Sequence, residues 1–169
     1  DETVWVGTRE GLYRYKDERL EPVDREGSVG DSYIRCLYRD SKGTLWIGTQ
    51  SDGLKWHRSG TSGGMSQFLG PGSRPLVSIL EDAEGSLWIG ADGEGLHRLR
   101  SGIFEMITAE DGLVADSVYA VYEDQSGAVW VGTDRGLTRI FDGRMQSFLP
   151  ADGLPHLFVR AFHEDAQGR

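Results

Sequence analysis

A five-residue phrase centred on a tryptophan occurs four times in this chain of 169 residues. The copies are Val4-Trp5-Val6-Gly7-Thr8, Leu45-Trp46-Ile47-Gly48-Thr49, Leu87-Trp88-Ile89-Gly90-Ala91 and Val129-Trp130-Val131-Gly132-Thr133. The tryptophans recur every 41 or 42 residues, and a fixed period in this range indicates a repeat protein. Each phrase is apolar, rich in β-branched and aromatic residues, and of strand length. The sequence therefore predicts one such strand in every repeat.

Three further segments of each repeat also have the composition of strands. Those that precede the tryptophan phrase are residues 33–38, 76–80, 118–122 and 158–162. Those that follow it are residues 11–15, 53–57, 95–99 and 136–140. The least regular set lies around Leu20 and at residues 65–69, 103–107 and 145–149. No segment shows a sustained helical period.

The turns before the tryptophan phrases open on aspartate and close on glycine. They are residues 40–43, 82–85, 124–127 and 165–168. Aspartate first and glycine last are typical of a type I turn with a left-handed last residue, which joins antiparallel strands. We therefore expect an all-β protein, a β-propeller with blade repeats of about 42 residues and four antiparallel strands each. A stacked sandwich or solenoid is the alternative.

The repeat phase defines expected boundaries within a single propeller segment. A partial first blade covers residues 1–30, and complete blades cover residues 31–72, 73–114 and 115–155. Residues 156–169 would supply the first strand of the next blade, or the strand that closes a ring of four. Because a fifth tryptophan phrase would fall due at about residue 171 by the period, we expect an excerpt of a longer array.

Composition limits the classes of partner. The net charge of −9 argues against nucleic acid and anionic membrane surfaces, which both require a positive stripe. A single cysteine, Cys36, cannot form an internal disulfide, and its apolar surroundings predict a packing role. No stretch approaches the length of a membrane span.

Four phrases in fixed order carry a resemblance to a known family. They are Asp111-Gly112-Leu113, Glu123-Asp124-Gln125-Ser126-Gly127, Val129-Trp130-Val131-Gly132-Thr133 and Arg135-Gly136-Leu137-Thr138-Arg139. Together they resemble the two-component regulator propeller repeat, and the likeness extends over nearly the whole chain. The resemblance implies seven-bladed propellers, often in tandem, in the extracytoplasmic sensor region of bacterial membrane receptors. It also implies a membrane helix and a histidine kinase or diguanylate cyclase elsewhere in the protein.

The sequence offers no positive evidence for catalysis, a cofactor or a metal. We expect Trp5, Trp46, Trp88 and Trp130 to form the structural blade core. The repeated aspartates and glycines are interpreted as turn residues. Calcium would need several oxygens converging in one loop, and Asp92-Gly93-Glu94 is the least unfavourable place for it. Histidines 57, 97, 156 and 163 lack metal-type spacing.

A binding surface is expected where the turns after the tryptophan phrases meet the connectors between repeats. Loops at one end of a repeat scaffold commonly carry function. The turns contribute Arg9, Glu10, Gln50, Asp52, Asp92, Glu94, Asp134 and Arg135. Because a site breaks repetition, the candidate ligand-binding residues are those that do not recur: Tyr33, Arg35, Arg74, Tyr119, His156 and Arg160.

Three functions follow as hypotheses. The first is a non-catalytic periplasmic sensor segment that binds a small polar ligand, with carbohydrate as one class, and acts with further blades and an output domain of the same chain. The full receptor could then work as a homodimer. The second is a structural or protein-interaction propeller without a small ligand. The third, an enzyme of the propeller-lyase or quinoprotein kind, lacks the convergent histidines or carboxylates it would need.

Overall fold

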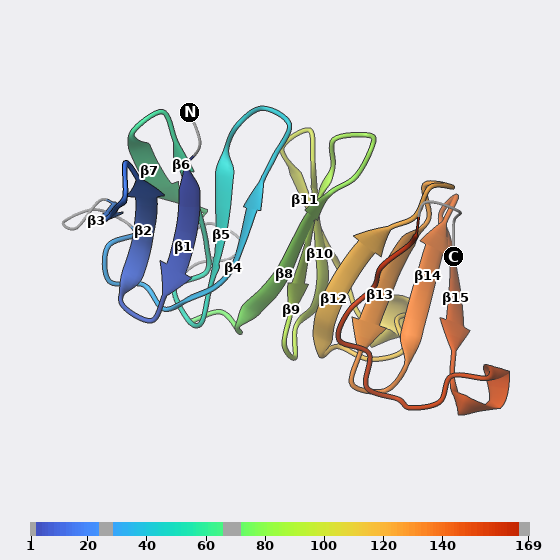
Figure 1. Ribbon diagram of the computed structural model, residues 1–169. Coiled ribbons are helices and arrows are strands. Elements are labelled where there is room, and N and C mark those ends of the chain that lie inside the picture. The colour runs from blue at the N-terminus through green and yellow to red at the C-terminus, as the bar shows by residue number, and fades with distance from the viewer. Residues whose placement is uncertain (1–2, 24–28, 66–71, 166–169) are drawn as a thin grey trace. The chain divides into compact units, whose positions relative to one another are not determined.

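The computed structural model describes residues 3–23, 29–65 and 72–165. Its strands form one three-stranded and three four-stranded antiparallel sheets, and the strands of each sheet follow one another in chain order (Figure 1). The chain divides into two compact units, residues 1–76 and 77–169. The expected all-β class with propeller-type blades is confirmed, because each complete sheet is a meander of four short strands.

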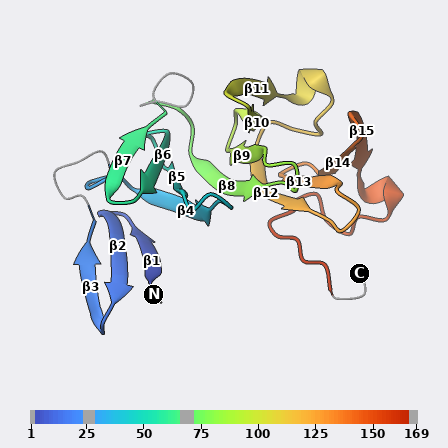
Figure 2. The same ribbon diagram turned by 90° about the horizontal axis from the view of Figure 1, so that it is seen from above.

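The first unit holds two sheets. One contains β1 (Val4–Thr8), β2 (Gly11–Lys16) and β3 (Arg19–Pro22). The other contains β4 (Ile34–Arg39), β5 (Leu45–Thr49), β6 (Leu54–Arg58) and β7 (Thr61–Gly64). Figure 2 shows β4 beside β1, and the two sheets share a core of Leu12, Val29, Ile34, Leu45 and Ile47.

The second unit holds the other two sheets. One contains β8 (Leu76–Glu81), β9 (Leu87–Ala91), β10 (Gly95–Arg100) and β11 (Ile103–Ile107). The other contains β12 (Val118–Glu123), β13 (Val129–Thr133), β14 (Leu137–Phe141) and β15 (Arg144–Phe148). Short 3-10 helices at Ala109–Asp111 and Pro150–Asp152 follow the last strand of each sheet. Trp88, Leu96, Leu113, Val118, Val129 and Val131 form the core of this unit.

The aspartate of each described turn before a tryptophan phrase performs two tasks. In the third sheet, Asp82 accepts hydrogen bonds from the backbone N–H of Ser86 through one oxygen (2.7 Å) and from the Trp88 ring N–H through the other (2.7 Å). The pairs Trp46–Asp40 (2.9 Å) and Trp130–Asp124 (2.7 Å) repeat the ring contact. The predicted turn chemistry is confirmed at residues 40–43, 82–85 and 124–127, whose glycines are left-handed. The fourth turn, at 165–168, extends outside the described residues.

The tryptophans differ in burial. The side chain of Trp88 is 3% exposed, whereas Trp5, Trp46 and Trp130 are half-buried.

Burial alone would raise the pKa of Asp124, but hydrogen bonds from Ser126, Trp130 and Ala128 outweigh it and hold the pKa at about 2. In each described tryptophan–aspartate pair, the ring N–H is satisfied by a carboxyl oxygen.

The glycine inside the tryptophan phrase is not a turn residue, which corrects its interpretation from sequence. A Cβ on Gly7 would lie 2.5 Å from Cγ2 of Ile34, and one on Gly132 would lie 2.8 Å from Cγ1 of Val159. Gly90 approaches Val118 in the same way. These glycines lie in the strands and let an aliphatic side chain of the neighbouring segment reach the backbone. They are packing residues.

Two predicted strands differ in the structure. The last strand of the second sheet is Thr61–Gly64 rather than 65–69, most of which lies outside the described residues. The indole of Trp56 covers Gly63, where a Cβ would come within 2.6 Å of Cζ2, so a glycine-bearing strand fits here. Residues 158–162 form no strand, and the backbone N–H of Val159 donates a hydrogen bond to the Thr133 carbonyl (2.9 Å).

Candidate functional site

The start of β4 carries an aromatic ring between two arginines. Tyr33 directly precedes the strand, and its carbonyl accepts a hydrogen bond from the backbone N–H of Gln50 (2.8 Å). The guanidinium carbons of Arg9 and Arg35 lie 5.3 and 5.8 Å from the centre of its ring. These are cation–π distances. Hydrogen bonding to Arg35 and then Arg9 lowers the pKa of Tyr33 below its usual value of 10.0.

The second unit has a related cluster around Arg160. Its guanidinium carbon lies 4.5 Å from the ring centre of Phe158 and 5.2 Å from that of Tyr119. The two rings are 4.9 Å apart, and the Tyr119 hydroxyl donates to an oxygen of Asp92 (3.2 Å). Burial, and then the charge of Asp92, raises the pKa of Tyr119. Phenol, guanidinium and carboxylate therefore lie within one small surface.

The two clusters occupy equivalent places in their repeats. Ile34 lies against Gly7 and Val159 lies against Gly132, so Tyr33-Ile34-Arg35 corresponds to Phe158-Val159-Arg160. In both triplets the arginine lies over the aromatic ring two residues before it. Alternation along an extended chain places the aromatic residue and the arginine on one side and the aliphatic residue on the other.

The structure therefore brings together some of the predicted residues and not others. Tyr33 and Arg35 are in contact, as are Tyr119 and Arg160. Arg74 is exposed before β8 and makes no stacking contact with Tyr33. His156 is exposed and accepts a hydrogen bond from the backbone N–H of Phe158 through Nδ1 (3.0 Å), so it shapes the loop.

Sequence reasoning missed two features of these surfaces. Phe158 was interpreted only as part of a strand, although its order with Val159 and Arg160 repeats that of Tyr33, Ile34 and Arg35. The bond between each tryptophan ring and an aspartate was missed too, although the two residues are six positions apart in each described pair. Comparing the repeats position by position would have found both.

The described part of the chain meets the requirements of neither a metal site nor a cysteine nucleophile. No three His, Cys, Asp or Glu side chains within it converge in a way that could hold a metal ion. The thiol of Cys36 lies 3.4 Å from the carbonyl of Leu76, and burial raises its pKa to about 12. A neutral buried thiol is a packing group rather than a nucleophile. No helix in the described ranges is both long and apolar enough to cross a membrane.

A comparison with family models gives one family. The model described as two component regulator propeller matches residues 28–51 and 112–135. Both segments contain the end of a connector, a first strand and the tryptophan phrase of a repeat. The resemblance seen in the sequence is thus confirmed for these two repeats. A comparison with curated proteins gives no significant match.

Solved structures with a similar fold include extracellular domains of two component systems and a lyase. The extracellular domain of BT3049 from B. thetaiotaomicron, described as a hybrid two component system, has a TM-score of 0.82 and 19% identity over 98% of this chain and 24% of that one. For BT4673 of the same organism and description, the TM-score is 0.80 and the identity 22%, over 98% and 22% of the two chains. A streptogramin B lyase matches with a TM-score of 0.68 and 17% identity over 90% and 51%.

These likenesses concern the fold. This chain spans about a quarter of the length of the two extracellular domains that it matches. The identities are low, and the similar structures include both two component systems and a lyase, so the function has to be argued from the side chains.

Proposed function

We propose that this chain, which carries two component regulator propeller repeats, is part of the non-catalytic sensor of a bacterial signalling receptor. In this proposal the segment lies outside the cytoplasm and binds a small polar ligand. Ligand binding then changes its geometry relative to a membrane-anchored output domain of the same protein. The family match and the likeness to two extracellular domains support this proposal. Further blades of a larger propeller complete it.

The observation that carries the proposal is the pair of arginine–aromatic clusters. Arg35 and Arg160 are exposed, and each has an aromatic ring beneath its guanidinium. The ring limits where the guanidinium can lie, and the guanidinium itself carries five N–H donors. An exposed guanidinium beside aromatic rings suits a saccharide, whose oxygens can accept hydrogen bonds and whose C–H groups can contact the rings. A carbohydrate is therefore the proposed ligand class.

A propeller enzyme is the weaker proposal. The streptogramin B lyase supports only the idea that a propeller can carry catalysis. A lyase would need a base near the bond it breaks. Nδ1 of His156, the one histidine among the candidate residues, instead accepts a hydrogen bond from the backbone N–H of Phe158. We therefore favour binding without turnover.

The test combines binding and signalling. The protein is applied to an array of immobilised neutral and acidic oligosaccharides, as wild type and as Arg35→Ala and Arg160→Ala. Losing charged hydrogen bonds of about 1.5–3 kcal/mol should weaken binding about tenfold or more for at least one variant. The control Arg144→Ala removes an exposed arginine of β15 outside both clusters and should bind as wild type.

The same substitutions are then placed in the intact receptor, with transcription of its target genes as the readout. The proposal predicts loss of the response with normal receptor abundance. If both variants bind the array and signal as wild type does, these arginines are not the site. Turnover of a bound saccharide would point to the enzyme instead.

A further inference from the structure

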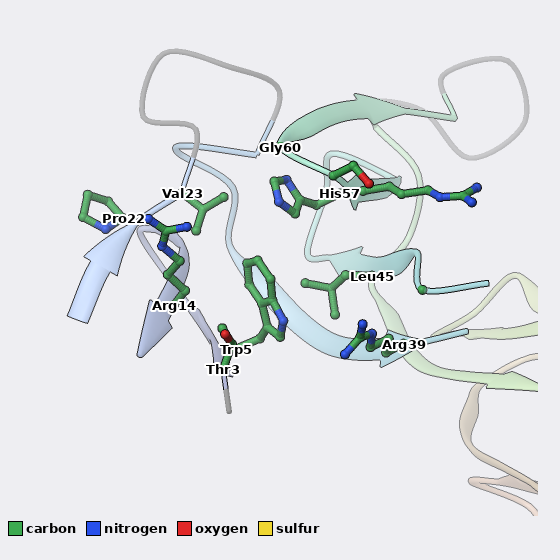
Figure 3. A pocket seen from close by; sticks show the side chains of 12 residues that line it. Thr3, Trp5, Arg14, Pro22, Val23, Arg39, Leu45, His57 and Gly60 are labelled. Carbon is green, nitrogen blue, oxygen red and sulfur yellow. The ribbon is translucent and has the colours of Figure 1, made fainter. Parts of the chain in front are cut away.

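A cavity in the first unit involves none of the residues of the arginine–aromatic clusters. It has a volume of about 660 Å³ and lies between the β1–β3 sheet and the β4–β7 sheet (Figure 3). This volume falls within the range of about 300–1,000 Å³ common for small-molecule sites. Its size alone allows a ligand of one or two rings. The identity of the lining decides which ligand fits.

The strand register determines which side chains face the cavity. Trp5 of β1 is directly opposite Arg14 of β2, so both project from one face of the first sheet. In the second sheet, Leu45 is opposite both Arg39 and His57, which places these three on one face. Figure 3 shows the Trp5 ring between these two faces, with Arg14, Arg39 and His57 around it.

The lining is positively charged in an acidic protein. The net charge of the chain is −9, yet no aspartate or glutamate is found among the described residues that line the cavity. Glu21, which is opposite Arg14 in the strand register, binds Arg14 at 2.7 Å, and the Arg14 side chain is about half exposed. Arg39 is exposed on the opposite wall. His57 contacts Trp5 with ring centres 5.2 Å apart, and its Nδ1 is 2.8 Å from Oγ of Ser62.

The second unit supplies an internal comparison. A cavity of about 640 Å³ lies at the equivalent place, with Trp88 and Arg98 on one wall. Opposite them are Glu123 and Ile140, at the positions of Arg39 and His57 in the strand register. Here the protein provides its own carboxylates.

Those carboxylates are already engaged. Glu84 lies 3.1 Å from Arg100 and 3.8 Å from Arg98, and Glu123 accepts a hydrogen bond from the backbone N–H of Ala83 (2.8 Å). Arg39 replaces the glutamate in the first unit, and a guanidinium cannot accept such a bond. The cavity wall that carries Glu123 in the second unit therefore carries Arg39 in the first unit, and it is basic instead of acidic. A basic wall can recognise an anionic ligand.

We propose that this cavity binds a small organic anion whose ring lies on the Trp5 indole and whose oxyanion group is held by Arg39 and Arg14. Guanidinium groups bind carboxylate, phosphate and sulfate through paired N–H donors, and the indole provides an apolar stacking surface. The common chemistry is an oxyanion carried by a ring. This site is separate from the clusters at Arg35 and Arg160 and does not depend on the proposed sensor function.

The experiment is calorimetric titration of the protein with three probes of matched ring. Glucuronate carries a carboxylate, glucose 6-phosphate carries a phosphate, and glucose carries no charge. We expect at least one charged probe to bind and glucose not to bind. Affinity should fall as salt is raised, because the contacts are ionic.

Two variants with the same change of charge locate the site. Arg39→Glu installs the residue that the second unit has at this position, and it should weaken binding of the charged probe at least tenfold. Arg19→Glu changes an exposed arginine of β3 outside the cavity and should leave affinity unchanged. Arg39→Gln, which removes the charge without reversing it, replaces the first variant if that variant unfolds.

Three results would overturn the proposal. The first is no heat with either anion, as expected if another part of the protein already fills the cavity. The second is equal binding of glucose and the anions. The third is equal weakening by Arg19→Glu and Arg39→Glu, which would indicate attraction by overall charge rather than a site.

Discussion

Replacing Gly90 by alanine tests whether the sheets are held at their observed spacing by the glycine of the tryptophan phrase. Gly90 lies in β9 within the buried core of the second unit. An alanine Cβ there would lie 2.6 Å from Cγ1 of Val118 and would also collide with Oγ of Ser78. Ordinary contacts between carbon atoms are about 3.5–4.0 Å, so β12 would have to move by about 1 Å.

The expected cost follows from two opposing effects. Inserting a methyl group into a well-packed core typically costs about 1–3 kcal/mol. Alanine also restricts the unfolded chain, which stabilises by about 0.4–1 kcal/mol where the backbone conformation is allowed. The net expectation is a loss of about 1–2 kcal/mol. For a chain of this length, that lowers the melting temperature by about 2–8 °C.

The measurement is thermal and urea unfolding followed by circular dichroism, with Gly64→Ala as the matched control. Gly64 is also a strand glycine without positive φ, but the nearest atom to its added Cβ is the Leu54 carbonyl oxygen at 4.0 Å. This control should be neutral or slightly stabilised. If Gly90→Ala unfolds at the same temperature as the wild type or above it, the close-approach argument is wrong.

Three further predictions concern buried groups. Trp88→Phe keeps an aromatic ring but loses the bond to Asp82, and it should cost about 1–3 kcal/mol of unfolding free energy, against about 3–5 kcal/mol for Trp88→Ala. Urea unfolding of Trp88→Phe with an unchanged free energy would contradict a role for the bond. Cys36, with its pKa raised to about 12 by burial, should react with a thiol reagent at pH 8 only after denaturation, and rapid labelling of the native protein would refute this. Burial lowers the pKa of His97, against an opposing effect of Glu94, so the unfolded state binds a proton at this residue more readily than the folded state does. The free energy of unfolding should therefore fall as the pH drops below about 6.5. His97→Leu should reduce this pH dependence in melting experiments at pH 5 to 7.

The fold was predictable because its determinants are local and repeated. The aspartate-to-glycine turns and the tryptophan phrases locate the strands of each sheet to within a residue or two. The prediction failed where a strand depends on a particular partner. Trp56 covers Gly63 and so favours Thr61–Gly64 as the edge strand, which periodicity alone does not reveal. Residues 158–162 have strand composition, but strand pairing is a property of two segments.

The candidate site was predictable in part because some of its residues break the repeat pattern. Searching for residues that break the repeat selected Tyr33 with Arg35 and Tyr119 with Arg160, which the structure places in contact. Composition could not indicate that Phe158 completes one cluster, because stacking depends on which side of the chain each residue faces. The basic cavity at Trp5 was missed as well. Its lining comes from six strands, β1 to β6, and the sequence does not show that these strands meet around one cavity.

Each described turn of the second unit is fixed twice, by its own aspartate and by a glutamate about one repeat later. Glu123 accepts a hydrogen bond from the backbone N–H of Ala83, 40 residues before it. Glu164 accepts one from the backbone N–H of Gln125, 39 residues before it. A deletion of one residue within β12 would move Glu123 to the opposite face of that strand and break its contact with Ala83. Evolution of such a chain is therefore constrained in length: whole repeats can be duplicated or exchanged, whereas single-residue insertions are tolerated only in the loops outside these contacts.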